Sequence, residues 1–423
     1  MTDSTAQTSH ANCSMDMPSD LEEPKPPADW PEGGTRAWLV VAGGFCVSFS
    51  TFGYSNAYGI YQDYYSQHML SHETQSTISW IGSVQLFFLY AGGVVGGPLF
   101  DRYGAKVMPL PALIMVVAVM MTSLCTQYYQ FMLAQGILGG LSSGMLFAPA
   151  MTCVSHYFHK RRATALGITV TGSSLGGVVF PIMLSRTIKS LGFAWSVRVV
   201  GFVILAMMAV AVLTVKERLP PRRGSILLPS AFARVPYALV VAGLFLMTLG
   251  LFTPFFYLPQ FAQRQGMSEN LASYMLSILN AASVFGRSLP GVVADRIGRY
   301  NTLVVEGTCS GILLLCWPAV SSNAGVIVFA VLYGFFSGGI ISLMSPCFAQ
   351  VTPQPNQMGT YLGMAMAMLG VAALAGTPIT GALLESGGSF THPAVFSGVV
   401  MLAGTVVSAV ARWWQNTALL AKV

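Results

Sequence analysis

The sequence predicts an all-α membrane protein with twelve transmembrane helices arranged as two six-helix halves. Three observations lead to this fold class. Only 9% of the 423 residues are charged and 54% are hydrophobic, with a mean hydropathy of +0.63, whereas a soluble globular protein carries about 25% charged residues. Twelve long apolar runs follow one another, and a Gly–Asp–Arg–Gly pattern occurs twice. A surface with so few charges is expected to face lipid.

Each predicted helix is an apolar run long enough to cross a bilayer, which takes about 20 residues. Most links between runs are short, so neighbouring helices are expected to run antiparallel. The longest internal polar stretch begins at KERLPPRRGS and separates the sixth run from the seventh. In chain order, the runs lie near residues 37–62, 78–99, 107–126, 129–155, 163–184, 196–215, 236–263, 271–294, 302–320, 325–351, 358–384 and 393–414.

The domain boundaries follow from these runs. Residues 1–35 are polar and rich in Ser, Thr, Pro and acidic residues, which predicts a disordered tail. Residues 36–215 form the N-terminal half, 216–235 a linker, 236–415 the C-terminal half and 416–423 a second tail.

The basic residues predict how the helices are oriented, because cytosolic loops carry an excess of Lys and Arg. Twelve basic residues fall in loops on one side, and three fall on the other. Both tails and the linker are therefore expected in the cytosol, next to anionic lipid headgroups. This accounts for the net charge of +6 without a nucleic-acid partner. The twelve are Arg102, Lys106, Lys160, Arg161, Arg162, Lys216, Arg218, Arg222, Arg223, Arg234, Arg296 and Arg299; the three are Arg186, Lys189 and Arg264.

The repeated charged turn links the two halves. The stretches GGPLFDRYGAK (96–106) and GVVADRIGRY (291–300) both fall in predicted cytosolic turns, at a constant offset of 194 residues. We interpret them as a conformational latch that breaks and reforms as the halves rock; the simpler alternative is a pair of charged loops that only fix topology. An Asp in such a turn can accept hydrogen bonds at a helix N-terminus. The latch residues are Gly97, Asp101, Arg102 and Gly104, matched by Gly291, Asp295, Arg296 and Gly298.

The first of these turns resembles the signature loop of the major facilitator superfamily. PEGGTRAW (31–38) and YFHKRRATALGITVTGSSLGG (157–177) resemble two signatures of its monocarboxylate transporter-like branch, and the short linker is similar to that of fungal members. The resemblance implies a secondary transporter that moves a small organic metabolite by alternating access. Fungal members move organic acids, vitamins or secondary metabolites, so both uptake and efflux stay open.

The resemblance also implies a substrate site. It assigns substrate binding to the arginine of helix 8, which is Arg287 here. The family's basic residue in helix 1 is replaced by Asn56, and the acid one turn before the arginine by Ser283. These departures argue against a lactate-like substrate and against proton symport through the family's usual groups.

Two charged residues inside apolar runs are site candidates in their own right. A buried guanidinium needs an anion, and no acid lies one turn from Arg287, so an organic anion is the expected counter-ion; the alternative is an arginine that snorkels to the cytosolic surface. Glu306 is the only acidic residue well inside a run. It is either a proton-coupling carboxylate or an interfacial residue that meets cytosolic arginines.

The sequence does not point to catalysis. It contains no HExxH or P-loop element and no Cys/His metal spacing, so we expect neither an enzyme nor a cofactor or metal. The expected partners are a small-molecule substrate, possible coupling protons and membrane lipids, and the expected location is the plasma membrane. A transport-inactive membrane receptor or sensor on the same fold is the alternative of another class.

Overall fold

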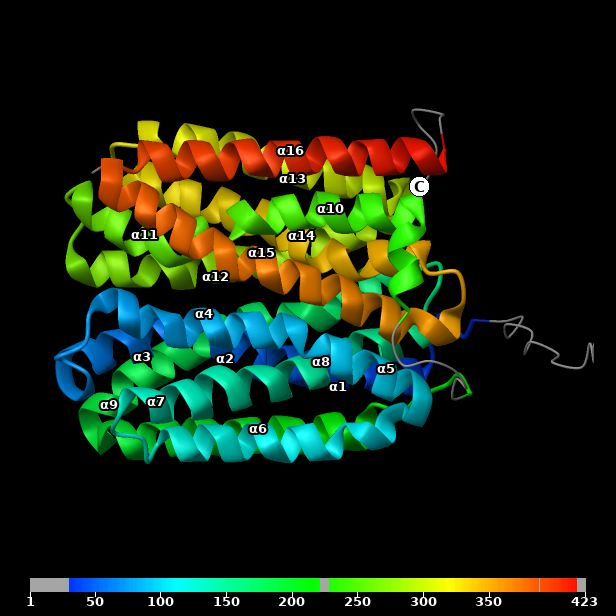
Figure 1. The fold of residues 1–423 in the computed structure, drawn as a ribbon, viewed down its shortest axis with the longest axis horizontal. Coiled ribbons are helices and arrows are strands. Elements are labelled where there is room, and N and C mark those ends of the chain that lie inside the picture. The colour runs from blue at the N-terminus through cyan, green and yellow to red at the C-terminus, as the bar shows by residue number, and fades with distance from the viewer. Residues whose placement is uncertain (1–29, 221–227, 388, 417–423) are drawn as a thin grey trace, which may run out of the picture.

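The computed structural model describes residues 30–220, 228–387 and 389–416, and within these ranges the regular segments are helices (Figure 1). Three parts of the predicted tails and linker lie outside the described residues: 1–29, 221–227 and 417–423.

Residues 30–220 cross the bundle six times. The last two crossings are two helices that share the label α9 and meet at Gly192, whose backbone is non-helical, with φ 74° and ψ 169°. Glycine adopts this positive φ without a Cβ clash, so the chain can reverse there in place of a loop. The helices are α1 (Thr35–Ser50), α2 (Phe52–Asn56), α3 (Tyr58–Tyr64), α4 (Gln75–Ala91), α5 (Gly93–Tyr103), α6 (Pro109–Thr122), α7 (Tyr128–Phe131), α8 (Gly140–Tyr157) and α9 (Arg162–Thr214).

Residues 228–416 cross six times more. Ten helices of the described chain are long and apolar enough to span a membrane; one of them is the interrupted α9, and the shorter apolar α6 supplies a further crossing. The count of twelve in two halves is therefore confirmed. The helices of this half are α10 (Val235–Leu251), α11 (Thr253–Arg264), α12 (Glu269–Ile297), α13 (Arg299–Cys316), α14 (Asn323–Val351), α15 (Met358–Gly387) and α16 (Thr391–Gln415).

The two halves lie against each other along their lengths, as Figure 1 shows. The contact between them is made chiefly by α12 on α9 and by α15 on α4 and α5. Within the halves, α1 packs on α9 and α10 packs on α16. The halves therefore meet chiefly through these three pairs of helices, which carry most of the residues described below.

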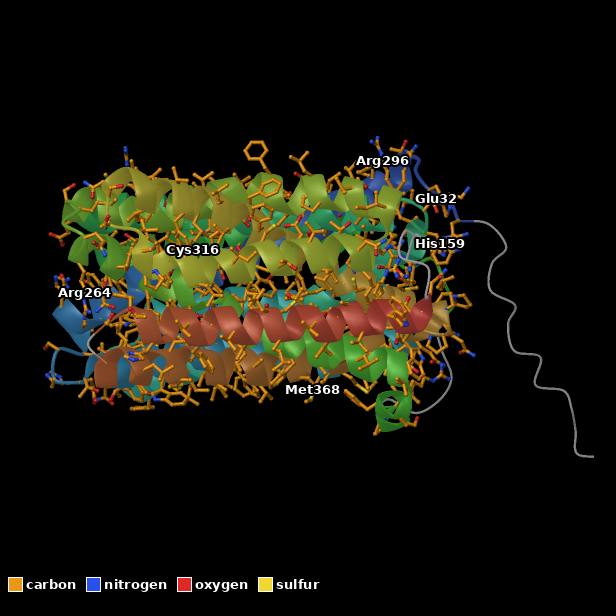
Figure 2. All side chains as sticks on the ribbon, turned by 90° about the horizontal axis from the view of Figure 1, so that it is seen from above. Glu32, His159, Arg264, Arg296, Cys316 and Met368 are labelled. Carbon is orange, nitrogen blue, oxygen red and sulfur yellow. The ribbon has the colours of Figure 1, made fainter. Side chains whose placement is uncertain are left out.

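The two ends of the bundle differ in charge, as the loop pattern predicts. Figure 2 shows Glu32, His159 and Arg296 at one end and Arg264 at the opposite end. We call the first the basic end, because it carries the loops of both charged turns. That this end faces the cytosol stays a prediction.

Candidate functional site

Asp101 joins the two halves at the basic end. It lies in the last turn of α5, its side chain is only 7% exposed, and its carboxylate receives hydrogen bonds from the second and third residues of α15. The backbone N–H groups of Gly359 and Thr360 donate over 3.0 and 2.7 Å, and the Thr360 hydroxyl donates over 2.7 Å. A carboxylate at this place binds the free N–H groups of the helix and its positive dipole end. Asp101 thus caps a helix of the other half.

Asp295 makes the equivalent contact from the C-terminal half to the N-terminal half. It lies near the end of α12, and its carboxylate accepts hydrogen bonds from the backbone N–H groups of Ala163 and Thr164 over 3.0 and 2.8 Å and from the Thr164 hydroxyl over 2.7 Å. These are the second and third residues of α9. Each half therefore caps a helix of the other, and we call the two contacts together the crossed caps.

The glycines of the repeated turns bring the halves into backbone contact. A Cβ added at Gly97 would collide with the carbonyl oxygen of Gly359 on α15, and one added at Gly291 would lie 2.6 Å from the carbonyl oxygen of Ala163 on α9. Real Cβ atoms do not approach this closely, so only glycine permits the crossed caps to form at these distances.

The remaining latch residues shape the turns or lie outside the caps. Gly104 and Gly298 have φ values of 68° and 110°, which turn the chain sharply after each Asp. The Glu217 carboxylate accepts a hydrogen bond of 2.8 Å from the N–H of Ala105, just after the first turn. By contrast, Arg102 and Arg296 are exposed and take no part in the caps.

Midway along the interface, polar side chains from both halves meet. Arg287 is 3% exposed and lies on α12, ten residues before its end. Its Nε donates to the Ser283 hydroxyl over 3.1 Å, and its NH1 donates to the carbonyl oxygen of Val170 over 3.1 Å and to the Ser173 hydroxyl of α9. The snorkelling alternative does not fit, because the guanidinium points into the other half.

Two asparagines and a further serine extend this group. Asn56 at the end of α2 donates from its amide to the Asn280 side chain of α12 and to the Ser173 carbonyl oxygen, both over 3.5 Å. The Ser174 hydroxyl of α9 donates to the Ser283 hydroxyl over 3.2 Å. The sequence-based site residues Asn56, Ser283 and Arg287 therefore belong to one group. We call it the central polar cluster: Asn56, Ser173, Ser174, Asn280, Ser283 and Arg287.

The central polar cluster carries a positive charge without a bonded carboxylate. The hydrogen-bond acceptors of Arg287 named above are two hydroxyl groups and a carbonyl oxygen, all neutral. In the described part of the chain, the one salt bridge within 4.0 Å joins Arg299 to Asp295 at the basic end. A buried guanidinium among neutral groups favours an anionic ligand, because a carboxylate matches its planar fork with two parallel hydrogen bonds.

Glu306 lies apart from this cluster, on α13. Its side chain is 5% exposed, its Oε2 has no hydrogen bond among the described residues, and it packs against Gly339 of α14. It is not an interfacial residue paired with an arginine. The preceding glycine, Gly338, packs against the Ser283 hydroxyl. Two successive glycines of α14 thus separate Glu306 from the central polar cluster.

A segment before α1 fixes the loop that leads into α9. The Glu32 carboxylate accepts hydrogen bonds from the N–H groups of His159, Lys160 and Arg161 over 2.8, 2.6 and 3.1 Å. Partial burial by itself would raise the pKa of Glu32, but these three donors outweigh it and the pKa is lowered. Arg299 of the other half donates to the His159 carbonyl oxygen over 2.8 Å.

Sequence reasoning missed the partners of the crossed caps and half of the central polar cluster. A signal for the partners is present: Thr-x-Leu-Gly occurs at 164–167 and again at 360–363, an offset of 196 residues. It places Thr164 and Thr360 at equivalent helix starts. Ser173, Ser174 and Asn280 have no such signal, because small polar residues are common in membrane helices and only the packing shows which of them face the other half.

Comparison with known proteins agrees with this architecture. The model of the Major Facilitator Superfamily matches residues 40–323 and 291–418. The chain is 52% identical to the aspyridones efflux protein of Emericella nidulans, with 92% of this chain and 80% of that protein covered. It is 43% identical to the agnestins efflux protein of Paecilomyces divaricatus, with 94% and 92% covered, and 38% identical to the fujikurins efflux protein of Gibberella fujikuroi, with 89% and 82% covered.

Solved structures share the fold. The human organic anion transporter has a TM-score of 0.72 at 16% identity and covers 89% of this chain with 100% of its own. The fucose:proton symporter of E. coli has a TM-score of 0.69 at 14% identity and covers 89% of this chain with 98% of its own. The family model and the related sequences establish that this chain belongs to the Major Facilitator Superfamily and is a multi-pass membrane transporter of a small molecule.

Proposed function

We propose that this chain exports an acidic secondary metabolite by alternating access. Its 52% identity, over 92% of the chain, to a protein named for aspyridone efflux carries the proposal of export. Relatives named for agnestin and fujikurin efflux support the same direction. Efflux is therefore favoured over uptake. The uncompensated charge of Arg287 supports an acidic substrate.

The crossed caps support the alternating-access mechanism. They tie α5 to α15 and α12 to α9 at one end of the bundle, which holds the halves together there. Opening that end requires both carboxylates to leave their helix N-termini. In this proposal Asp101 and Asp295 are the latch, Gly97 and Gly104 allow it to close, and the exposed Arg102 and Arg296 act on the local electrostatic potential alone.

In the proposed substrate site, Arg287 binds the acidic group of the substrate, and Ser283 orients the guanidinium through its bond to Nε. Asn56 faces the same space from the other half and offers an amide for a second polar group of the substrate. Because Arg287 is bonded to α9 when the latch is closed, a substrate that takes over those bonds would loosen one contact between the halves.

We further propose that Glu306 carries a coupling proton. Lone carboxylates inside membranes are costly unless they are paired or protonated, and Oε2 of Glu306 is buried without a partner among the described residues. The pair Gly338–Gly339 lies between Glu306 and Ser283. A change in the Glu306 charge can therefore shift α14 against α12, which carries the central polar cluster.

The finer assignments complete the proposal. The motifs at 31–38 and 157–177 support the monocarboxylate transporter-like branch. The charge bias supports cytosolic termini at the basic end and anionic lipids around it. The relatives named for efflux support a plasma-membrane location. Residues 36–215 and 236–415 are the proposed halves, and 216–235 is the linker between them.

Reconstituted vesicles test the proposal. Proteoliposomes that contain the full chain are loaded with aspyridones, agnestins or fujikurins, and release is followed by mass spectrometry with and without an imposed proton gradient. We expect release of at least one of these compounds above the rate of empty liposomes, and acceleration by the gradient. Binding of a compound without release would identify the transport-inactive receptor and refute export. A release rate that is the same with and without the proton gradient would refute proton coupling alone.

A further inference from the structure

A continuous row of aromatic rings runs from one half to the other. The ring centroids of Phe147 and Phe52 lie 4.8 Å apart, those of Phe52 and Tyr90 5.3 Å, those of Tyr90 and Phe252 6.4 Å, and those of Phe252 and Phe255 5.8 Å. The contact between Tyr90 of α4 and Phe252, at the junction of α10 and α11, joins the two halves. We call these five rings the aromatic band.

The aromatic band adjoins the central polar cluster. Phe52 and Asn56 are four residues apart on α2, which places them on the same face of that helix. Tyr90 packs edge-on against Phe52, so its ring lies beside the same face. One site at the interface therefore combines a cation, amide groups and aromatic faces, contributed by both halves.

This combination selects for a particular shape of ligand. The guanidinium favours two coplanar oxygens, and the ring faces favour a flat, polarisable body over a puckered saturated one of the same size. All five rings are at most 9% exposed, so a ligand that separates the halves would have to replace ring–ring contacts with contacts of its own. A flat ligand can replace the ring–ring contacts with the smallest loss of contact area.

We infer that the central site takes a flat conjugated acid, in which a carboxylate or an equally acidic pair of oxygens is attached to an aromatic or unsaturated ring system. This inference deepens the proposed function and rests on it. Tyr90 and Phe252 determine the preference for a flat body. Arg287 determines the preference for an acid.

Three probes separate these preferences. 2-Naphthoate is a flat acid, decahydro-2-naphthoate is the saturated acid with the same carbon skeleton, and 2-naphthalenemethanol is flat and uncharged. Binding of each to the purified full chain is measured by calorimetry. We expect 2-naphthoate to bind about tenfold more tightly than either of the other probes, in line with the strength of aromatic pairs and of charge-assisted hydrogen bonds.

The variants assign each preference to its residue. Tyr90→Leu and Phe252→Leu should reduce the preference for the flat acid over the saturated acid to about twofold or less, while Tyr90→Phe keeps it. Arg287→Lys should weaken the binding of both acids by a similar factor. The matched control is Phe131→Leu, which removes a buried ring that packs on Tyr65 and has no ring contact with the aromatic band. Thermal unfolding curves show which variants are folded.

Equal binding of the two acids to the wild-type chain, or no binding of either, would overturn the inference. So would an unchanged preference in folded Tyr90→Leu and Phe252→Leu chains. These outcomes differ from a failure of the proposed function: selective binding of 2-naphthoate without export from vesicles refutes transport and keeps the flat-acid site. Export of the metabolites without any preference for flat acids refutes the site and keeps transport.

Discussion

Replacing Asp101 with Asn should release the basic end without unfolding the protein. Asn keeps one acceptor oxygen, but it replaces the other with an NH₂ group that faces the N–H of Thr360. It also removes the negative charge from the start of α15. Losing one charge-assisted hydrogen bond costs about 1.5–3 kcal/mol, and losing the helix-dipole interaction costs about 0.3–1 kcal/mol more.

From these terms we expect the closed state to lose about 2–4 kcal/mol, which is a shift of about 30- to 800-fold in the equilibrium between closed and open basic ends. Transport should slow, because the cycle then dwells in one state, while membrane insertion and abundance stay near the wild-type level.

The opening can be measured as a distance between the halves. Spin labels on Lys106→Cys and Pro353→Cys report on exposed loops of the N-terminal and C-terminal halves at the basic end. The parent chain, with its own cysteines, serves as the labelling blank. Glu217→Gln is the matched control, because that carboxylate also receives a backbone N–H bond at this end, from Ala105, but links no helix of the other half. An unchanged distance distribution and a wild-type transport rate in Asp101→Asn would refute the latch.

Four further predictions follow from the same geometry. Arg287→Lys should weaken the apparent affinity in export assays by about 10- to 100-fold, because the charge stays but the two parallel hydrogen bonds are lost. Glu306→Gln should abolish the pH dependence of export while export itself continues. Gly97→Ala should open the basic end as Asp101→Asn does, without any change of charge, because the Cβ would collide with Gly359. Glu32 has a pKa below its ordinary value of 4.5, so its carboxylate stabilises the fold fully above that value and progressively less as the pH falls through the lower pKa. The melting temperature of Glu32→Gln should accordingly lie below that of the wild type at pH 6, and the two should converge as the pH falls through the lowered pKa.

Each of these predictions has an outcome that contradicts it. Wild-type affinity in both Arg287→Lys and Arg287→Ala would remove this residue from the site. A pH profile unaltered by Glu306→Gln would leave that residue a structural role. For Gly97→Ala the control is Gly59→Ala, since an added Cβ at Gly59 meets no atom within 4 Å; equal label distances in the two variants would disprove the close-contact argument. A constant difference in melting temperature across the pH series would show that the charge of Glu32 is irrelevant.

The crossings of the fold could be predicted because lipid demands long apolar runs, and these are visible residue by residue. The reversal at Gly192 was harder to predict, since the residues between the fifth and sixth runs look like an ordinary loop, and only the backbone shows that two helices meet there at one glycine. The latch turns were predictable from their repetition. Their backbone partners Gly359 and Ala163 were not, because a hydrogen bond from a backbone N–H leaves no mark on the residue type. The repeated threonines, Thr164 and Thr360, were the only sequence signal for the two helix starts.

The central polar cluster was predictable only in part, for a related reason. Arg287 stands out because charge is rare inside a membrane run. Asn280 and Ser173 become visible only once α9 and α12 are placed face to face. Glu306 was predicted as buried or interfacial, and its depth was decided by the packing of α13 on the glycines of α14.

Comparing equivalent positions of the two halves shows which features occur in both halves and which occur in one. Gly167 of α9 lies against the carbonyl oxygen of Arg287, and Gly363 of α15, 196 residues later, lies against that of Gly93. Gly93 is the counterpart of Arg287 at the 194-residue offset, and Ala112 is the counterpart of Glu306. The crossed caps and these glycine contacts therefore occur in both halves, as in a two-fold dimer whose subunits contact each other through identical surfaces. The two charged groups proposed to bind the substrate and the proton occur in one half alone. The contacts that govern the motion of the halves are symmetric, whereas the proposed substrate and proton sites are not. Substitutions in the C-terminal half can therefore change selectivity without changing those contacts.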